Sequence, residues 1–287
     1  MDLNKIMNLM NFFNDTFEIS TISESNDFNS AILLLTNKCN KIIYQKYKLL
    51  NRVGNKHKSY VLFHKEHTNE IIFEKKREKI FPFTNDILKS MGYSAIGKEL
   101  LPGNNHFPLL KFYQENPEFD FYWLIEDDVH YNGNWSNFLT FFLKFSSTDF
   151  LSSHIYEFYE KPNWYWWNTL SHSNKIILSQ NKLSSFNPIY RLSNRALAYL
   201  HNQLKDGWKG HHEVLIPTLL KQGGFNIQDF GGTGQYVAKN CINRFYKIIE
   251  INQIEKLFGN SMRFKPNISP IEITENLLYH PVKYFGD

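Results

Sequence analysis

The sequence predicts an α/β fold in which helices flank a mixed, mostly parallel sheet, and three observations indicate it. Two short apolar runs, 31–35 and 60–63, enclose a helical pattern at 42–50, which is the order of a β-α-β unit. A third apolar run, at 121–125, has the composition expected of a strand that is buried on both faces. With 287 residues, 42% of them hydrophobic, the chain is long enough for one large α/β domain or for two tightly packed lobes.

The remaining elements are predicted from local patterns of apolar and turn-forming residues. They are a short strand at 70–73, a helix at 85–91 capped by Thr84, helices at 106–114 and 135–145, a strand that begins at 149–151, and helices at 193–204 and 213–220. Residues 157–185 are expected to form an inserted loop, because much of this stretch is rich in serine, asparagine and lysine. Residues 1–30 form a separate segment with a rough helical pattern, which is expected to pack against the domain, with a partner or a membrane surface as the alternative.

The overall charge and the cysteine content narrow the class of protein. The chain has 32 basic and 28 acidic residues and a net charge of +4, a small excess that suits an anionic small-molecule substrate. Binding of nucleic acid is not expected, because the basic residues are not strongly clustered. Cys39 and Cys241 are far apart in the sequence, so neither a disulfide framework nor a zinc motif is expected. The sequence contains no apolar stretch of membrane-spanning length, and we expect a cytoplasmic protein, with peripheral contact at the inner face of the membrane as an alternative.

Three consecutive carboxylates, Glu126, Asp127 and Asp128, follow the apolar run at 121–125. In α/β sheets ligands bind beyond the carboxyl ends of the strands, so these acids are expected at a ligand site. Adjacent carboxylates repel one another unless a cation compensates them, and hard divalent cations prefer oxygen ligands combined with substrate phosphates. The triplet therefore predicts a site for a metal and a diphosphate, and the alternative is a solvated turn before the next helix.

The arrangement of these elements resembles a known family. A β-α-β half that leads into a strand ending in Glu126-Asp127-Asp128 is similar to the amino-terminal half of GT-A nucleotide-sugar glycosyltransferases. The triplet resembles the Glu-Asp-Asp form of their DXD motif, and residues 123–135 are similar to a group of bacterial glycosyltransferases.

The resemblance implies a domain organisation and an activity. Residues 31–287 would form a single GT-A-like catalytic domain with a Rossmann-type sheet, in which 31–135 bind the nucleotide and 136–287 bind the acceptor. The activity would be divalent-metal-dependent transfer of a hexose or N-acetylhexosamine from a nucleotide-sugar, a UDP-sugar in the first place. The acceptor would be a glycan or a lipid-linked molecule, and the process would be surface-polysaccharide biosynthesis.

The same resemblance implies roles for individual residues near the triplet. Asp128 would bind Mn²⁺ or Mg²⁺ directly, while Glu126 or Asp127 would contact the ribose or a metal-bound water. Because side chains alternate along a strand, Glu126 and Asp128 share one face, so Glu126 is the second expected metal ligand. Thr36 and Asn37 come just after the first strand, where GT-A proteins contact the nucleotide.

Close to the end of the chain, His280 and Lys283 resemble an element that some GT-A enzymes fold over the diphosphate. An imidazole can complete the ligand shell of Mn²⁺, and an ammonium group can neutralise phosphate. The alternative is that packing of Tyr279 and Pro281 alone explains this motif.

An inverting transferase also needs a carboxylate that removes the proton from the acceptor hydroxyl. By the resemblance, this base lies where a loop enters a helix in the carboxyl-terminal half, and Glu213 holds that position, after a histidine in place of the usual second acid. Asp229, which precedes the glycine-rich stretch 231–234, is the second candidate. The alternative for Glu213 is an acid in the first helical turn that the helix dipole favours, and a retaining enzyme would not need this base.

The aromatic block Trp164–Trp167 has two interpretations, stacking on sugar rings or packing in the interior. Two other classes of function also stay open at the level of sequence. A metal-dependent phosphoesterase or nucleotidyltransferase would use the acidic cluster with His212 or His280 and would bind two metals. The other class is a non-catalytic glycan-binding protein on a transferase scaffold.

Overall fold

The computed structural model describes residues 28–54, 56–65, 79–248, 261–264, 267–269, 273 and 276–283. Nearly all of the predicted segment 1–30, and the strand predicted at 70–73, lie outside the described residues. Within the described ranges, no helix is long and apolar enough to cross a membrane.

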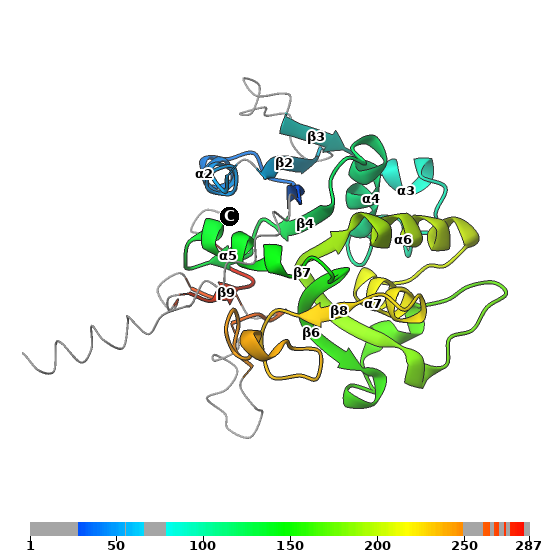
Figure 1. Cartoon of the computed structure of the whole chain (residues 1–287). Coiled ribbons are helices and arrows are strands. Elements are labelled where there is room, and N and C mark those ends of the chain that lie inside the picture. The colour runs from blue at the N-terminus through cyan, green and yellow to red at the C-terminus, as the bar shows by residue number, and fades with distance from the viewer. Residues whose placement is uncertain are drawn as a thin grey trace, which may run out of the picture.

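A seven-stranded sheet forms the centre of the molecule (Figure 1). Its strands are β1 (Ser30–Thr36), β2 (His57–His64), β3 (Ile80–Phe83), β4 (Phe121–Glu126), β6 (Phe150–Glu157), β7 (Leu183–Ser193) and β8 (Ile227–Asp229). Their order across the sheet is β3-β2-β1-β4-β7-β6-β8. All neighbouring strands are parallel except β7, which is antiparallel to both β4 and β6. The predicted α/β fold with a mixed, mostly parallel sheet is therefore confirmed.

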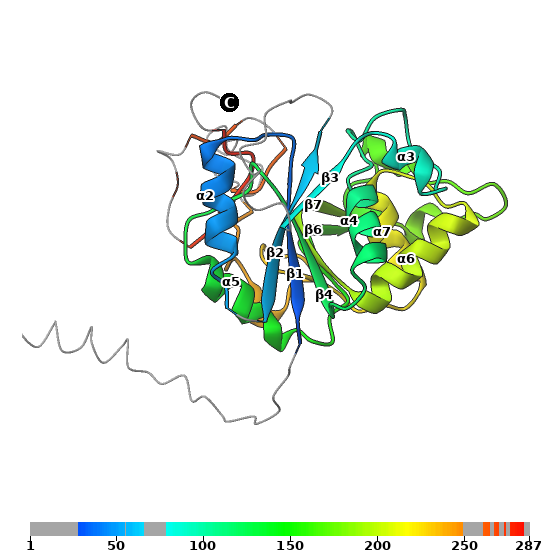
Figure 2. The same cartoon turned by 90° about the horizontal axis from the view of Figure 1, so that it is seen from above.

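Helices cover both faces of this sheet, as the view from above shows (Figure 2). They are α2 (Lys41–Leu50), α3 (Ile87–Ser90), α4 (His106–Glu115), α5 (Trp135–Phe141), α6 (Asn194–Asp206) and α7 (His212–Gln222). The pair α2 and α5 lies on one face, and the other four helices lie on the opposite face. A second, two-stranded sheet pairs β5 (His130–Tyr131) with β9 (Leu278–Tyr279).

Alternating side chains of the central strands supply both layers of the core. Leu33 of β1 and Leu124 of β4 pack with the residues of α4, α6 and α7. Leu34 and Ile125, the next residue of each strand, pack with the residues of α2 and α5. All four side chains are fully buried. Because both faces of these strands are covered, their sequences are continuous apolar runs, which made them predictable.

Strand β7 corrects the sequence analysis, which predicted a loop over 157–185 and no strand after it. The loop ends before β7, and the strand contains Ser185, Asn187 and Arg191, which are polar although buried. Their polar groups bond internally: Ser185 Oγ donates to Asn187 Oδ1 at 2.7 Å, and Arg191 donates to backbone carbonyls of the segment after α5. Hydrogen bonding allows polar residues to be buried, so β7 occupies the sheet without an apolar pattern.

The other differences concern where helices begin and end, and one short strand. Helix α3 is shorter than the helix predicted at 85–91, and its N-cap residue is Asp86 and not the predicted Thr84. Strand β8 was not predicted. The helices predicted at 106–114, 193–204 and 213–220 are confirmed within two residues, and the one at 135–145 becomes α5 followed by a 3₁₀ turn.

Candidate active site

The acidic triplet lies at the carboxyl end of β4, between β1 and β7. Glu126 is the last residue of the strand, and Asp127 and Asp128 form the turn toward β5. Lys46 of α2 donates hydrogen bonds to the backbone carbonyls of Glu126 at 2.9 Å and Asp127 at 3.0 Å, and a third, short one to that of Val129. The sequence analysis missed Lys46, which lies 80 residues before Glu126. Its ammonium group fixes the turn through the backbone, so these bonds do not occupy the carboxylate oxygens.

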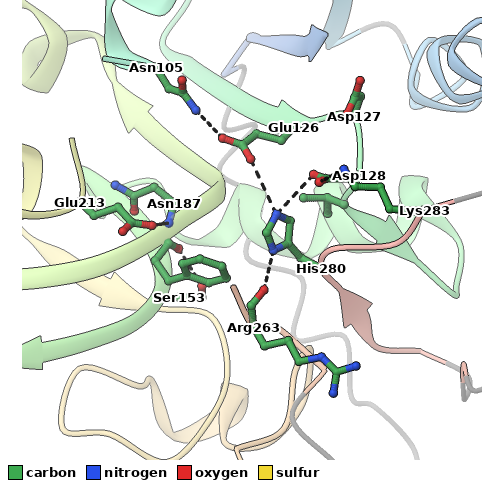
Figure 3. A network of polar contacts seen from close by, with 12 residues as sticks. Asn105, Glu126, Asp127, Asp128, Ser153, Asn187, Glu213, Arg263, His280 and Lys283 are labelled. Atoms are coloured by element: carbon green, nitrogen blue, oxygen red, sulfur yellow. Dashed lines mark hydrogen bonds and ion pairs between the residues drawn. The ribbon is translucent and has the colours of Figure 1, made fainter. Parts of the chain in front are cut away.

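A histidine from the end of the chain joins this group (Figure 3). Pairing of β9 with β5 brings His280 to the triplet, and its Nε2 lies 3.3 Å from Asp128 Oδ1 and 3.8 Å from Glu126 Oε2. Among the described residues, Glu126, Asp128 and His280 form a group whose ligand atoms all lie within 4.8 Å of one another. Asp127 points away from them, as strand alternation predicts (Figure 3). The structure therefore brings together the three residues predicted to bind the metal.

The orientation of His280 fits a metal ligand. Its Nδ1 lies 2.7 Å from the backbone carbonyl of Arg263. A carbonyl can only accept, so Nδ1 carries the proton, and Nε2 faces the two carboxylates. A histidine that binds a metal almost always donates its other ring N–H to a carbonyl, a carboxylate or water, and His280 has this arrangement.

Charges within the cluster compensate one another. Burial lowers the pKa of His280, but its hydrogen bond to Asp128 and the two neighbouring carboxylates outweigh burial and raise it. For Asp128, burial acts to raise the pKa, but contacts with His280 and Lys283 hold it well below the usual range. Burial raises the pKa of Glu126 to about 7, although the charge of His280 acts in the opposite direction. Glu126 therefore titrates near neutral pH, while Asp128 stays ionised.

The residues predicted to contact the nucleotide lie on both sides of the triplet. Thr36 at the end of β1 donates from its hydroxyl to Asp127 Oδ2 at 2.6 Å, and Asn37 follows it in an exposed position. Lys283 Nζ lies 2.7 Å from Asp128 Oδ2, and 39% of its side chain is exposed. The ammonium group of Lys283 is thus next to the candidate metal site and also accessible to a ligand.

Asn105 is a further neighbour of the triplet that the sequence analysis did not identify. It precedes α4 and is buried, and its Nδ2 donates to Glu126 Oε1 at 2.5 Å. Its other polar atom, Oδ1, is buried without a hydrogen-bond partner in the described part of the chain. Nothing in the sequence indicated this residue, because an asparagine before a helix usually serves as a cap.

The predicted base Glu213 lies in the first turn of α7, beside the same group. Its Oε1 accepts from the backbone N–H of Asn187 in β7 at 3.2 Å, and its Oε2 lies 3.7 Å from His211 Nδ1. Burial raises its pKa to about 8, and the charge of Glu126 adds to this shift, while the hydrogen bond from Asn187 lowers it. In Figure 3, Glu213 and Asn187 lie on one side of His280 and Lys283 lies on the other.

The second predicted base, Asp229, belongs to a separate buried network. Its carboxylate accepts from the hydroxyl of Tyr246 at 2.8 and 2.9 Å, and from the backbone N–H groups of Ile155 at 3.0 Å and Gly231 at 2.9 Å. Burial raises its pKa to about 7, while these hydrogen bonds lower it. The glycine belongs to this packing, since a Cβ at Gly231 would meet the Tyr246 ring at 2.4 Å. These contacts are typical of a carboxylate that holds loops together.

Comparisons with known proteins give a family match and several structural neighbours. Residues 44–150 match the model of a family described as "Protein of unknown function (DUF3405)". No curated protein sequence matches the chain.

Three similar solved structures are glycosyltransferases. The galactosyltransferase LgtC in complex with donor and acceptor sugar analogs is 13% identical, with 70% of this chain and 74% of that chain covered and a TM-score of 0.40. An active-site mutant of LgtC is 11% identical, with 73% and 81% covered and a TM-score of 0.40. A glycosyltransferase involved in glycosylation of the major capsid of PBCV-1 is 10% identical, with 61% and 64% covered and a TM-score of 0.30.

Proposed function

We propose that this chain transfers a sugar from a nucleotide-sugar donor to a hydroxyl of a glycan or lipid-linked acceptor, with one divalent cation. The observation that carries the proposal is the group of Glu126, Asp128 and His280 at the end of a central strand, beside the acid Glu213, whose side chain is only 13% exposed. A cation site next to a separate acid-base group is what a metal-assisted transfer to a hydroxyl requires. Surface-polysaccharide assembly is the process in which we expect it.

The ligand atoms of Glu126, Asp128 and His280 suit Mn²⁺ and also Mg²⁺. Two carboxylates provide the oxygen ligands that both ions accept, and the imidazole of His280 favours Mn²⁺ of the two. When bound, the cation would act as a Lewis acid that stabilises the negative charge on the departing nucleoside diphosphate. We expect a UDP-sugar as the donor.

The side chains around the cation site divide the remaining work. Thr36, Asn37 and Asp127 lie on the side of β1 and are proposed to contact the nucleoside. Lys283 is proposed to neutralise the diphosphate, since its ammonium group is partly exposed beside Asp128.

Glu213 is proposed to accept the proton of the acceptor hydroxyl, which makes the reaction inverting. A general base works best when its pKa lies near the working pH, and burial places that of Glu213 at about 8. Asp229 is less suited to this role, because its oxygens already accept hydrogen bonds from Tyr246, Ile155 and Gly231.

Calorimetric titration of the full chain with UDP, GDP and CMP tests the proposal, each nucleotide with Mn²⁺ and again with EDTA. We expect one of the three to bind, and only when Mn²⁺ is present. The nucleotide that binds would identify the base of the donor. Binding that does not respond to EDTA, or no binding of any of the three, would contradict the proposal.

A further inference from the structure

The aromatic block Trp164–Trp167 divides into interior residues and a surface group. Trp167 is 2% exposed, and its indole N–H donates to a backbone carbonyl at 2.7 Å. Tyr165 is 72% exposed, and Trp164 and Trp166 are half-buried. Interior packing therefore applies to Trp167 and to Trp164, which packs against the core and against Trp167, and the surface interpretation stays open for Tyr165 and Trp166.

The surface group lies against the start of α7. The indole of Trp166 stacks on the imidazole of His211, with ring centroids 4.2 Å apart and an angle of 22° between the rings. Tyr165 packs edge to face against Trp166 at 4.9 Å and 74°. His211 in turn caps α7, and its Nδ1 lies 3.7 Å from Glu213 Oε2. The imidazole thus connects the aromatic pair to the proposed base.

Contacts between the end of the block and the segment before α7 fix this position. Thr169 Oγ1 donates to the backbone carbonyl of Trp166 at 2.7 Å and accepts from the backbone N–H of His211 at 3.0 Å. Gly210 allows the segment before α7 to approach the end of the block closely, because a Cβ at Gly210 would meet Leu170 Cα at 3.0 Å. The aromatic pair is therefore already ordered, which reduces the entropy lost when a ligand binds.

We propose that Tyr165 and Trp166 form a platform for a sugar residue of the acceptor, so that the acceptor is a glycan. The apolar C–H face of a sugar ring packs well on an aromatic ring, and its hydroxyls stay free to bond polar neighbours. Because the rings of Tyr165 and Trp166 lie at 74° to each other, one ring can stack on the face of such a sugar while the other contacts its edge. The platform lies against the start of α7, the helix whose first turn contains Glu213. The inference rests on the proposed function, because it takes Glu213 as the group that accepts the proton.

Saturation-transfer difference NMR of the full chain with UDP and Mn²⁺ tests this platform, with the methyl glycosides of glucose, galactose and N-acetylglucosamine as probes. We expect signals from the ring C–H protons of at least one glycoside. Trp166→Ala should weaken this binding by about tenfold, whereas Trp166→Phe should retain most of it because a flat apolar ring is kept. Tyr159→Ala is the matched control and should leave glycoside binding unchanged. Tyr159 is a 69% exposed tyrosine in the same connection between β6 and β7.

Calorimetric titration of the same samples with UDP measures donor binding separately. Tyr165→Ala gives a second variant at a surface position, where the fold is not at risk. The platform is overturned if both alanine variants bind the glycosides like the wild type, or if a protein that binds UDP gives no glycoside signal. A wild-type protein that binds neither UDP nor a glycoside would instead contradict the proposed function, and the platform with it.

Discussion

Two carboxylates of the site, Asp128 and Glu213, lie in opposite environments. Burial acts to raise the pKa of Asp128, but hydrogen bonds with His280 and Lys283 hold it well below the usual range. Burial raises the pKa of Glu213 to about 8, and a backbone N–H from Asn187 offsets this only in part. One side of the site thus has a permanent negative charge that suits a cation, and the other has an acid that exchanges protons near neutral pH. Such a separation of pKa values is how two carboxylates take different roles in one reaction.

The largest effect is expected from replacing Glu213, the proposed proton acceptor. Glu213→Gln should lower the transfer rate by about 10²- to 10⁴-fold, the usual contribution of a general base, and should spare binding of UDP with Mn²⁺. The measurements are UDP release from the donor and calorimetric UDP binding. Asp229→Asn is the matched control: it should lower stability by about 1 to 3 kcal/mol, because buried N–H donors lose an acceptor, yet leave the rate within about tenfold. A rate loss in Asp229→Asn as large as in Glu213→Gln would remove the distinction between the two acids.

The next largest effect is expected on cation binding at Asp128. Asp128→Asn should weaken Mn²⁺-dependent UDP binding by more than about a hundredfold, since loss of an outer-shell partner alone typically costs about 10- to 100-fold. Calorimetric titration with and without EDTA measures it. Asp120→Asn provides a control, because Asp120 is an exposed acid at the opposite end of β4. Equal affinity in the Asp128 variant and the wild type would show that the cation does not bind at Asp128.

The affinity for Mn²⁺ should also depend on pH. Burial raises the pKa of Glu126 to about 7, and contacts with carboxylates raise that of His280. Both groups must lose their protons before they bind a metal, so the affinity should rise between about pH 6 and about pH 8, by up to about tenfold per pH unit for each proton released. Mn²⁺ titrations followed by electron paramagnetic resonance measure this. A constant affinity over the range would mean that neither group binds the ion.

The last effect concerns the stability of the fold and not the reaction. Glu213 has a pKa of about 8 in the folded chain and one of about 4.3 when unfolded. The folded state therefore holds a proton that the unfolded state releases, and the contribution of this group to stability falls as the pH rises through this interval. Glu213→Gln lacks this loss and should be more stable than the wild type at pH 7 by up to about 4 kcal/mol, because pH 7 lies about 2.7 units above the unfolded pKa and each pKa unit corresponds to about 1.4 kcal/mol. Urea unfolding should give a smaller difference at about pH 5 than at about pH 8; an equal difference at both values would mean that the carboxyl is not perturbed.

Strands β4 and β7 show how much of the fold could be predicted from the sequence. Both lie in the middle of the sheet, and they pair with each other. The first is apolar because both of its faces are buried, and this pattern predicts a strand. The second buries Ser185, Asn187 and Arg191, and the partners that make this burial possible include groups from other parts of the chain. A polar strand of this kind can be recognised only when its hydrogen-bond partners are known.

The candidate site also contains residues that could be predicted from the sequence and residues that could not. The position of Glu126 and Asp128 at a strand end could be predicted from three adjacent acids after an apolar run, and that of His280 beside them from the resemblance to GT-A enzymes. Lys46 and Asn105 could not, because their contacts with the acidic turn join residues 80 and 21 positions apart through the tertiary fold. Lysine on an amphipathic helix and asparagine before a helix are common, so neither carries a signal in the sequence.

The claim that Glu126, Asp128 and His280 bind one divalent cation is tested most directly by anomalous diffraction from crystals grown with Mn²⁺ and UDP. We predict a single manganese peak between the two carboxylates and Nε2 of His280, next to the diphosphate. Two peaks several ångströms apart would favour a two-metal phosphoesterase or nucleotidyltransferase. Bound UDP without a manganese peak at these three residues would contradict the claim.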